Sequence, residues 1–385
     1  MQLTSNRTGR VTTTQTGYQT FIPNNLPPSP SIVIDAEMQY LLSAADRKLG
    51  RLDGITRILP NPDLFLAMYV KKEAVLSSQI EGTQASLVDV LNAPTKEEEP
   101  KKNGDVKDVV NYVNAINYGL DRLKELPLSL RLIREIHEVL LRGVRGSDKS
   151  PGEFRKTQNW IGPQGCTLAT ATFVPPPVEE MKAAMGELEK FFYDESFIPP
   201  LIKIAMIHAQ FETIHPFLDG NGRVGRLLIT FWLCQQDILS QPLLYLSYYF
   251  KHHRTEYYDR LMSVRLNGDW ENWIKFFLRG VAEVSDESIN SATAIIALKD
   301  RFAKKLADIQ GTGVNHQKLL DYLFQAPVID RKQVTDVLGV SSPTAGTLLD
   351  SFCELGILTD STPEKQRNKV YYFNDYLAIL EKGTE

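Results

Sequence analysis

The sequence predicts a mainly α-helical protein that contains a small β-hairpin and ends in a separate unit of three helices and two strands. From about Asp35 onward, apolar residues recur at the three- and four-residue spacing that is typical of helices packed on a core. Residues 170–174 are instead rich in β-branched and aromatic side chains, and the three prolines that follow cannot continue a strand. These observations favour a helical core interrupted by one exposed hairpin.

Length and composition set the class of protein. With 385 residues, of which 43% are hydrophobic, the chain can bury a large core and form more than one domain. The net charge of −4 gives no global signature for nucleic acid, and no apolar run of about 18 residues predicts a membrane span. The first residues lack the apolar core of a signal peptide, and three scattered cysteines predict no disulfide framework. We therefore expect a cytoplasmic protein without membrane contact.

Composition and periodicity divide the chain into four expected segments. The first is an N-terminal region whose initial 31 residues are rich in Thr, Asn and Pro and are expected to be extended or loosely packed, with Phe21 docking on the core. Its main helix is expected at about 64–82. A helical core, a linking helix and a C-terminal unit follow. The boundaries of the four segments are 1–104, 105–285, 286–310 and 311–385.

The most informative segment runs from His215 to Arg226 and combines one imidazole, one carboxylate, two glycines around an amide, and two guanidinium groups. The apolar run 227–233 predicts a buried helix, so the glycines belong to a loop that leads into a helix N-terminus. The unpaired N–H groups and the dipole of such an N-terminus form an anion site. The segment is therefore suited to hold a polyphosphate and to move a proton beside it.

Glycine and carboxylate positions in this segment each suit one task. Gly220 and Gly222 let backbone N–H groups approach phosphate oxygens closely, and the Asn221 amide adds a donor. Asp219 precedes them, and a carboxylate beside a phosphate site most often holds Mg²⁺ together with phosphate oxygens. A simple turn is the alternative for the glycines alone.

The basic residues complete the set. Arg223 and Arg226 are three residues apart, share one helix face, and suit terminal phosphates. His215 can take a proton from an attacking hydroxyl. Taken singly, each is more often a solvated arginine or a packed histidine, so the fixed spacing of the whole set carries the prediction. No Gly-x-x-x-x-Gly-Lys-Ser/Thr motif is present, which excludes a P-loop, and no second His or Cys stands at zinc-ligand spacing.

A second segment of interest is the helix expected at 64–82, which ends in Ser-Ser-Gln-Ile-Glu-Gly. Ser77 and Glu81 stand four residues apart and share one helix face, and Gly82 is a typical helix stop. On local features alone, this is the end of an amphipathic helix with an ordinary surface glutamate.

The segment from His215 to Arg226 matches the signature His-x-Phe-x-Asp-Gly-Asn-Gly-Arg-x-x-Arg of the Fic family without a departure. Residues 151–155, with 160–162, resemble the strand-entry segment of that family, and 170–177 resemble its flap, so the resemblance covers roughly residues 40–285. The family consists mostly of protein adenylyltransferases, which move AMP from ATP to a hydroxyl of a protein. The resemblance implies a Fic-type helical core with the small hairpin as its flap.

The resemblance also implies roles for individual residues. His215 would deprotonate the target hydroxyl, Asp219 would bind Mg²⁺, and Arg226 would meet the γ-phosphate of ATP. The α- and β-phosphates would be held by Gly220, Asn221, Gly222 and Arg223. The helix ending at Glu81 is similar to the family's inhibitory Ser/Thr-x-x-x-Glu-Gly/Asn helix. Ser77 and Glu81 would then be the inhibitory pair, because Arg226 cannot serve Glu81 and the γ-phosphate together.

Two further sets of residues are candidates for substrate contacts. An exposed hairpin edge can take a target segment as an added strand, and the flap residues expected there are Thr170, Ala171, Thr172, Phe173 and Val174. Adenine needs an apolar slot with one or two polar partners, for which the candidates are Tyr248, Tyr249, Tyr257, Tyr258 and Asn267. The alternative is that these tyrosines, at helical spacing, belong to the core.

Residues 311–385 resemble a winged helix-turn-helix, because three short helical patterns precede two strand patterns that flank a polar loop. Ser341 would cap the recognition helix, with Pro343 in its first turn. That helix is poor in Arg and Lys, whereas the wing carries Lys365, Arg367 and Lys369. Since phosphate contacts come mainly from Lys and Arg, the sequence leaves weak DNA contact and protein docking equally open.

The leading prediction is an autoinhibited protein adenylyltransferase that uses ATP and Mg²⁺, acts on a Ser, Thr or Tyr hydroxyl and releases pyrophosphate. Its partners would be ATP and a target protein at the flap, with self-modification and a homodimer as further expectations. Alternatives on the same fold are transfer of UMP, phosphate or phosphocholine, and removal of AMP from a target with Glu81 positioning water. A nucleotide-sensing transcription regulator is the alternative of another class, and the intact His215 argues against it.

Overall fold

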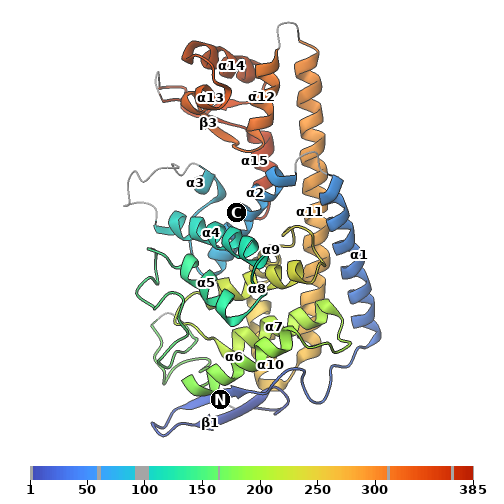
Figure 1. Ribbon diagram of the computed structural model, residues 1–385, viewed down its shortest axis with the longest axis vertical. Coiled ribbons are helices and arrows are strands. Elements are labelled where there is room, and N and C mark those ends of the chain that lie inside the picture. Colours follow the sequence, from blue (N-terminus) through green and yellow to red (C-terminus); the bar gives the residue numbers. More distant parts are fainter. Residues whose placement is uncertain are drawn as a thin grey trace.

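The computed structural model describes residues 3–58, 62–91, 104–163, 165–309, 313–365 and 368–384. Over these residues the chain is mostly helical, as predicted, with a long helix that runs from the helical core up to a smaller C-terminal unit (Figure 1). The wing residue Arg367 lies outside the described residues.

The N-terminal residues form a hairpin rather than a loosely packed segment. Strands β1 (Gly9–Thr13) and β2 (Gln19–Pro23) pair antiparallel, with Val11 opposite Phe21. Phe21 is fully buried, as predicted, and its N–H donates to the carbonyl oxygen of Val174 at 3.0 Å. The hairpin is therefore attached to the segment that precedes α6 (Val178–Phe192).

The two longest helices pack against each other along the molecule. Helix α1 (Ala36–Ile58) packs along the first part of α11 (Trp270–Ala307), a helix of 38 residues (Figure 1). The boundary expected at residue 285 between the core and a linking helix is not a break, because α11 passes through it without interruption. The same helix thus belongs to the core and carries the C-terminal unit.

The central pair of helices is α7 (Pro200–Ile214) and α8 (Asn221–Gln235). Nearly every residue of both is buried, and a helix that is apolar on all sides lies inside a core. The surrounding helices are α2 (Pro62–Ile80), α3 (Leu87–Leu91), α4 (Gly104–Leu123), α5 (Leu130–Leu140), α9 (Ser247–His252) and α10 (Arg254–Asn267). The loop between α7 and α8 is therefore held from several sides.

The stretch between α5 and α6 differs from the expectation of nearly continuous helix. Its described residues, 141–163 and 165–177, contain no helix, and the predicted flap hairpin is reduced to a single antiparallel bridge between Ile161 and Phe173. Phe173 is fully buried and lies under the guanidinium of Arg265, 4.2 Å from ring centroid to Cζ. Packing of this side chain, rather than a ladder of strand hydrogen bonds, fixes the segment.

The C-terminal unit combines three helices, a three-stranded sheet and a final helix. Its elements are α12 (Val314–Leu323), β3 (Val328–Asp330), α13 (Arg331–Leu338), α14 (Ser342–Glu354), β4 (Thr359–Asp360), β5 (Val370–Tyr372) and α15 (Asn374–Glu381). The sheet order is β3-β5-β4, so β3 adds a strand that the sequence did not predict. Ser341 caps α14 by accepting the Thr344 N–H, as predicted. Among the described residues, no helix is long and apolar enough to cross a membrane.

The approach of α4 to α8 gives a test of the fold. A Cβ on Gly119 would lie 2.4 Å from the buried ring of Phe231, whereas a Cβ on Gly186 in α6 would meet no atom within 4 Å. We expect Gly119→Ala to destabilise the protein by about 1–3 kcal/mol through overpacking. Gly186→Ala should stabilise it by up to about 1 kcal/mol through helix propensity. Denaturant unfolding of both variants measures the difference, and equal effects would contradict this packing.

Candidate active site

The loop between α7 and α8 has a fixed backbone. His215, at the end of α7, and Gly220, at the start of α8, both adopt left-handed conformations, with φ of 50° and 77°. Inside the loop, the Asn221 side chain accepts the Phe217 N–H and donates to the Phe217 carbonyl oxygen, each at 2.8 Å. The Asn221 amide thus shapes the loop, and its role in holding phosphates stays a prediction.

His137 in α5 is a residue of the site that sequence reasoning missed. Its Nδ1 accepts the Gly152 N–H at 2.9 Å, so the ring proton is on Nε2, which donates to the Asp219 carbonyl oxygen at 3.0 Å. The ring is fully buried and stacks on Phe217 with centroids 3.7 Å apart, and burial lowers its pKa to about 4. A neutral imidazole therefore joins two loops and orients Asp219.

His215 is held so that its ring stays neutral at physiological pH. Its carbonyl oxygen accepts hydrogen bonds from Arg155 Nε at 3.1 Å and from Asn159 Nδ2 at 3.0 Å. Burial lowers the pKa of the imidazole to about 3, and the charges of Arg265 and Arg155 add to that shift. An unprotonated imidazole can accept a proton, which is the property that a general base needs.

Arg226 is the buried charge of the site, and the end of α2 neutralises it. Its Nε donates to Ser77 Oγ at 2.8 Å, and its Nη2 donates to the Ser77 carbonyl oxygen at 2.9 Å and to Glu81 Oε1 at 2.8 Å. Burial alone would lower the pKa of Arg226, but the Glu81 charge outweighs it and raises that pKa. Burial likewise opposes the charge of Glu81, whose pKa is nevertheless lowered by Arg226. The predicted contact between Glu81 and Arg226 is present.

Glu81 also covers the start of α8. A Cβ on Gly222 would lie 2.3 Å from Glu81 Oε1, so the carboxylate rests directly over the first turn of that helix. The first turn of α8 has no side-chain cap, which leaves its N–H groups facing this region. A negative group is stabilised at a helix N-terminus. Glu81 therefore occupies the place that the sequence predicted for an anion.

Two carboxylates lie on the other side of the same turn. Asp219 Oδ1 accepts the Gly220 N–H at 2.6 Å and stands 3.5 Å from Arg223 Nη2. Burial raises the pKa of the Asp108 carboxyl, the Arg223 charge opposes that rise, and the Asp219 charge adds to it. The Asp108 Oδ1 has no hydrogen-bond partner among the described residues. The residues that the structure describes contain no group of three or more side chains that could hold a metal ion together. Because Mg²⁺ takes one or two carboxylates plus phosphate oxygens, Asp219 fits an ion that arrives with a polyphosphate.

Glu73 extends the α2 face that carries Ser77 and Glu81, and sequence reasoning did not single it out. It lies four residues before Ser77 and is almost fully buried. Its Oε1 accepts hydrogen bonds from Tyr112 Oη at 3.0 Å and Ser247 Oγ at 2.5 Å. Burial raises the pKa of this carboxyl to about 7, although Ser247 and the charge of Arg226 oppose the rise. A second titratable group therefore lies behind the contact between Glu81 and Arg226.

The predicted flap residues divide into two groups. Thr170 and Thr172 are exposed and Ala171 is half-buried. Phe173 and Val174 are buried, and their backbones already bond to Ile161 and Phe21. The prediction of an open strand edge is therefore wrong for Phe173 and Val174, because the N-terminal hairpin and the core cover them.

The predicted adenine residues are not brought together. Only Tyr258 is partly exposed near the motif: burial raises the pKa of its hydroxyl to about 12, and the Glu81 charge adds to the shift. Tyr257 is buried, and its hydroxyl bonds to Nε2 of His208 in α7 at 2.8 Å. The other three lie elsewhere: Tyr249 packs on Phe276, Asn267 bonds to Thr4, and Tyr248 lies beside Lys72 and Gly383.

Two family profiles match the chain across these elements. The Fic/DOC family N-terminal profile matches residues 39–121, and the Fic/DOC family profile matches residues 127–233, which include the motif loop. The chain therefore contains both domains of the Fic/DOC family, at residues 39–121 and 127–233. The two matches together contain both sides of the contact between Glu81 and Arg226.

Named relatives are similar over part of the chain. A probable protein adenylyltransferase of Aquifex aeolicus is 31% identical over 182 residues, which are 46% of this chain and 51% of that protein. The protein adenylyltransferase Fic of Culex quinquefasciatus is 31% identical over 165 residues, 42% of this chain and 29% of that protein. The chain thus spans about half or less of the length of these curated relatives.

A solved structure shares the fold. The crystal structure of a Fic family protein from Desulfovibrio desulfuricans G20 superposes with a TM-score of 0.58 at 19% identity, covering 89% of this chain and 97% of that chain. The shared fold extends over most of both chains.

Glu73 gives a pH-dependent prediction. Its folded-state pKa of about 7 lies above the ordinary value of 4.5, so its contribution to stability is present at low pH and is lost as the pH rises through about 7. We expect Glu73→Gln to remove part of the fall in melting temperature between about pH 5 and about pH 8. The exposed control Glu125→Gln should follow the wild type. Parallel curves for the wild type and Glu73→Gln would contradict the buried carboxyl.

Proposed function

We propose that this protein transfers AMP from ATP to a hydroxyl group of a protein, releases pyrophosphate, and is inhibited by its own Glu81. The observation that carries the proposal is a neutral His215 beside the uncapped start of α8, where Arg223 and Arg226 are buried. This arrangement supplies a base, a helix N-terminus and two fixed positive charges to one small volume. The names of the relatives favour AMP as the group that is moved.

In this proposal, the ATP phosphates lie over the first turn of α8. Backbone N–H groups at Gly222 and Arg223 would hold the inner phosphates, and Arg226 would pair with the γ-phosphate. His215 would accept the proton of the target hydroxyl while the hydroxyl oxygen forms a bond to the α-phosphorus. The bond between that phosphorus and the bridging oxygen would break, and pyrophosphate would leave. Mg²⁺ held by Asp219 and phosphate oxygens would neutralise charge on the polyphosphate.

The contact between Glu81 and Arg226 supports the inhibitory role. Glu81 Oε1 lies 2.8 Å from Arg226 Nη2, so the γ-phosphate cannot use the same donor while the carboxylate is there. The carboxylate also lies over Gly222, where a phosphate would bind. Because in-line attack needs the reacting atoms within about 3–3.5 Å, even a small displacement of the α-phosphate stops the reaction.

Label transfer from ATP tests both roles. With α-³²P-ATP, Mg²⁺ and a lysate as the source of targets, we expect Glu81→Gly to raise protein labelling by on the order of tenfold. His215→Ala in the Glu81→Gly background should lower it by about 10²–10⁴-fold, because the general base is lost.

The position of the label provides the control. Label from γ-³²P-ATP would instead indicate a kinase on this fold. Absence of label from either position in every variant would contradict adenylylation and favour another donor or a nucleotide-sensing regulator. A gain in Glu81→Gly that persists with His215→Ala would contradict the assigned base.

The target would dock near the exposed part of the flap. Thr170 and Thr172 are exposed there, and Trp160 is 42% exposed although its Nε1 bonds to the Cys166 carbonyl oxygen. This surface can contact a protein segment without a long strand ladder. Removal of AMP, self-modification, a homodimer and a cytoplasmic location stay predictions.

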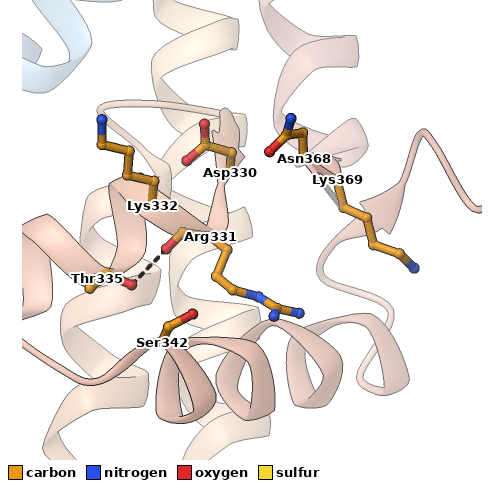
Figure 2. A pocket seen from close by; sticks show the side chains of 7 residues that line it. All are labelled: Asp330, Arg331, Lys332, Thr335, Ser342, Asn368 and Lys369. Atoms are coloured by element: carbon orange, nitrogen blue, oxygen red, sulfur yellow. Dashed lines mark hydrogen bonds between the residues drawn. The ribbon is translucent and has the colours of Figure 1, made fainter. Parts of the chain in front are cut away.

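A basic hollow in the C-terminal unit favours the proposal that this unit is a winged helix-turn-helix that contacts a nucleic-acid backbone. The hollow has a volume of about 470 Å³ between the starts of α13, α14 and β5 (Figure 2). Its lining residues are Asp330, Arg331, Lys332, Thr335, Ser342, Asn368 and Lys369. Lys369 is committed to Asp360 at 2.6 Å, but Arg331 and Lys332 have no ion-pair partner among the described residues. Two uncommitted cations beside polar groups suit a phosphate.

Gly346 makes room for one of these cations. A Cβ at Gly346 would lie 3.3 Å from the guanidinium carbon of Arg331, so the guanidinium rests in the notch that the glycine leaves on α14. The arginine is thereby directed toward the hollow without a carboxylate to hold it. Such an arginine loses little freedom when it binds an anion.

Salt-dependent DNA binding tests the hollow. We expect a labelled duplex to bind weakly and Arg331→Ala to reduce the salt slope by about 1, as for one lost phosphate contact. Lys318→Ala, which removes an exposed charge from α12, should change the slope less. Equal slopes for the wild type and Arg331→Ala, or no binding at low salt, would favour protein docking for this unit.

A further inference from the structure

One face of α2 is directed toward Arg226, and another face is covered by the C-terminal unit. We call residues 374–384, which comprise α15 and the three residues after it, the α15 segment. Helix α15 contacts α2 directly (Figure 1). Gln79 Nε2 donates to the Thr384 carbonyl oxygen at 3.3 Å, and Thr384 is buried. Gln79 stands two residues before Glu81, so the α15 segment holds the same turn that carries the inhibitory carboxylate.

A second contact ties the α15 segment to α2 through Tyr248. Gly383 has a φ of +82°, and a Cβ there would lie 2.1 Å from the Tyr248 ring. The ammonium of Lys72, in α2, lies 5.6 Å from the centroid of the same ring and pairs with Glu287 of α11 at 3.1 Å. Tyr248 is thus enclosed between α2 and the α15 segment, in a space that only a glycine at position 383 leaves open.

The other end of the α15 segment is fixed to the C-terminal unit. Phe373, just before α15, packs on Phe302 of α11 and on Phe324 after α12, with ring centroids 5.6 and 5.2 Å apart. Tyr376 packs on Phe324 at 4.9 Å, and Asp375 pairs with Arg301. A rigid element that is anchored at one end in the C-terminal unit therefore reaches the inhibitory helix at its other end.

The hydrogen bonds of the turn at Glu81 link the position of this residue to that of Gln79, which the α15 segment contacts. The Glu81 N–H donates to the Ser78 carbonyl oxygen at 3.0 Å, and the Gly82 N–H donates to the Gln79 carbonyl oxygen at 3.0 Å. A displacement of Gln79 therefore shifts the peptide that carries Glu81. Because nearly every residue of α8 is packed in the core, the helix cannot follow that shift, and the contact with Arg226 lengthens.

We propose that the α15 segment holds α2 in the position in which Glu81 engages Arg226, so that a partner bound to the C-terminal unit releases the site by moving this segment. The link to activity rests on the proposed adenylylation. The coupling itself depends on two contacts at the C-terminal end of the segment, that of Thr384 with Gln79 and that of Gly383 with Tyr248.

Two glycine variants of the full chain test the proposal. Gly383→Ala places a methyl group against Tyr248. Gly356→Ala, in the same unit, imposes a similar left-handed strain at φ +64° but meets no atom within 4 Å. We expect Gly383→Ala to raise AMP labelling by on the order of fivefold over Gly356→Ala, the lower end of typical coupling between sites. In the Glu81→Gly background, the two variants should label equally, because no inhibitory contact remains to be released.

Hydrogen–deuterium exchange of α2 provides a readout that does not depend on catalysis. We expect faster exchange of the α2 amides in Gly383→Ala than in Gly356→Ala. Gln79→Met keeps the length of the side chain and removes its hydrogen bonds to the carbonyl oxygens of Thr384 and Ala85. It should show the same increase if Gly383→Ala fails to fold.

The outcomes separate the two proposals. If Glu81→Gly labels targets but Gly383→Ala matches Gly356→Ala in both labelling and exchange, the coupling is wrong. If no variant labels, the proposed adenylylation fails, and the exchange of α2 alone decides the coupling. Faster exchange would then support the mechanical link, and equal exchange would overturn it.

Discussion

The buried guanidinium of Arg226 is the constraint on which the site depends. An arginine keeps its proton under all ordinary conditions, so burial inside a helical core leaves a fixed charge that needs partners. In this structure the partners are Ser77 and Glu81 at the end of α2, although α2 and α8 are far apart in the sequence. In the proposed function, the γ-phosphate of ATP is the other anion that would bind at this place. Competition between Glu81 and nucleotide would then follow from the burial of one charge.

Burial is the main reason that the histidines of the site are neutral, and the same positive environment adds to it. Burial lowers the pKa of His137 to about 4 and that of His208 to about 3, and nearby arginine charges oppose protonation of both rings. His215 is subject to both effects. The fixed cations therefore do two things at once: they attract phosphate, and they keep the base free to accept a proton. Loss of an arginine should disturb both properties.

The sequence predicted the parts of the site that are local. The motif from His215 to Arg226 defines its own loop and helix, because turn residues and an apolar run suffice to specify them. The contact between Glu81 and Arg226 was predicted only through the family resemblance, since nothing local in the sequence joins residues 145 positions apart. The winged-helix assignment of the C-terminal unit stays a prediction, although its helices and wing strands are present.

Other features were beyond prediction because the same pattern fits more than one environment. His137 stands on the apolar face of a helix, where a packed histidine and a loop-holding histidine look alike. Glu73 looks like any helical glutamate until the fold buries it. Tyr248 and Tyr249 are neighbours in the sequence, yet they point to different surroundings, one toward the α15 segment and one into the core. The residues between β1 and β2 carry no turn motif strong enough to predict that these two strands pair.

The position of α2 explains why control of this site can come from outside the catalytic helices. Helices α7 and α8 are buried on nearly all sides, so any movement of the motif would cost core packing. Helix α2 is largely buried as well, between that core and the C-terminal unit, but Glu81 lies in a turn after its last helical residue and is partly exposed. Its carboxylate can leave Arg226 at the cost of one ion pair and a few hydrogen bonds, while the phosphate site keeps its shape. In the proposed function, an inhibitory element with these properties would respond to a partner without disturbing the groups that carry out the chemistry.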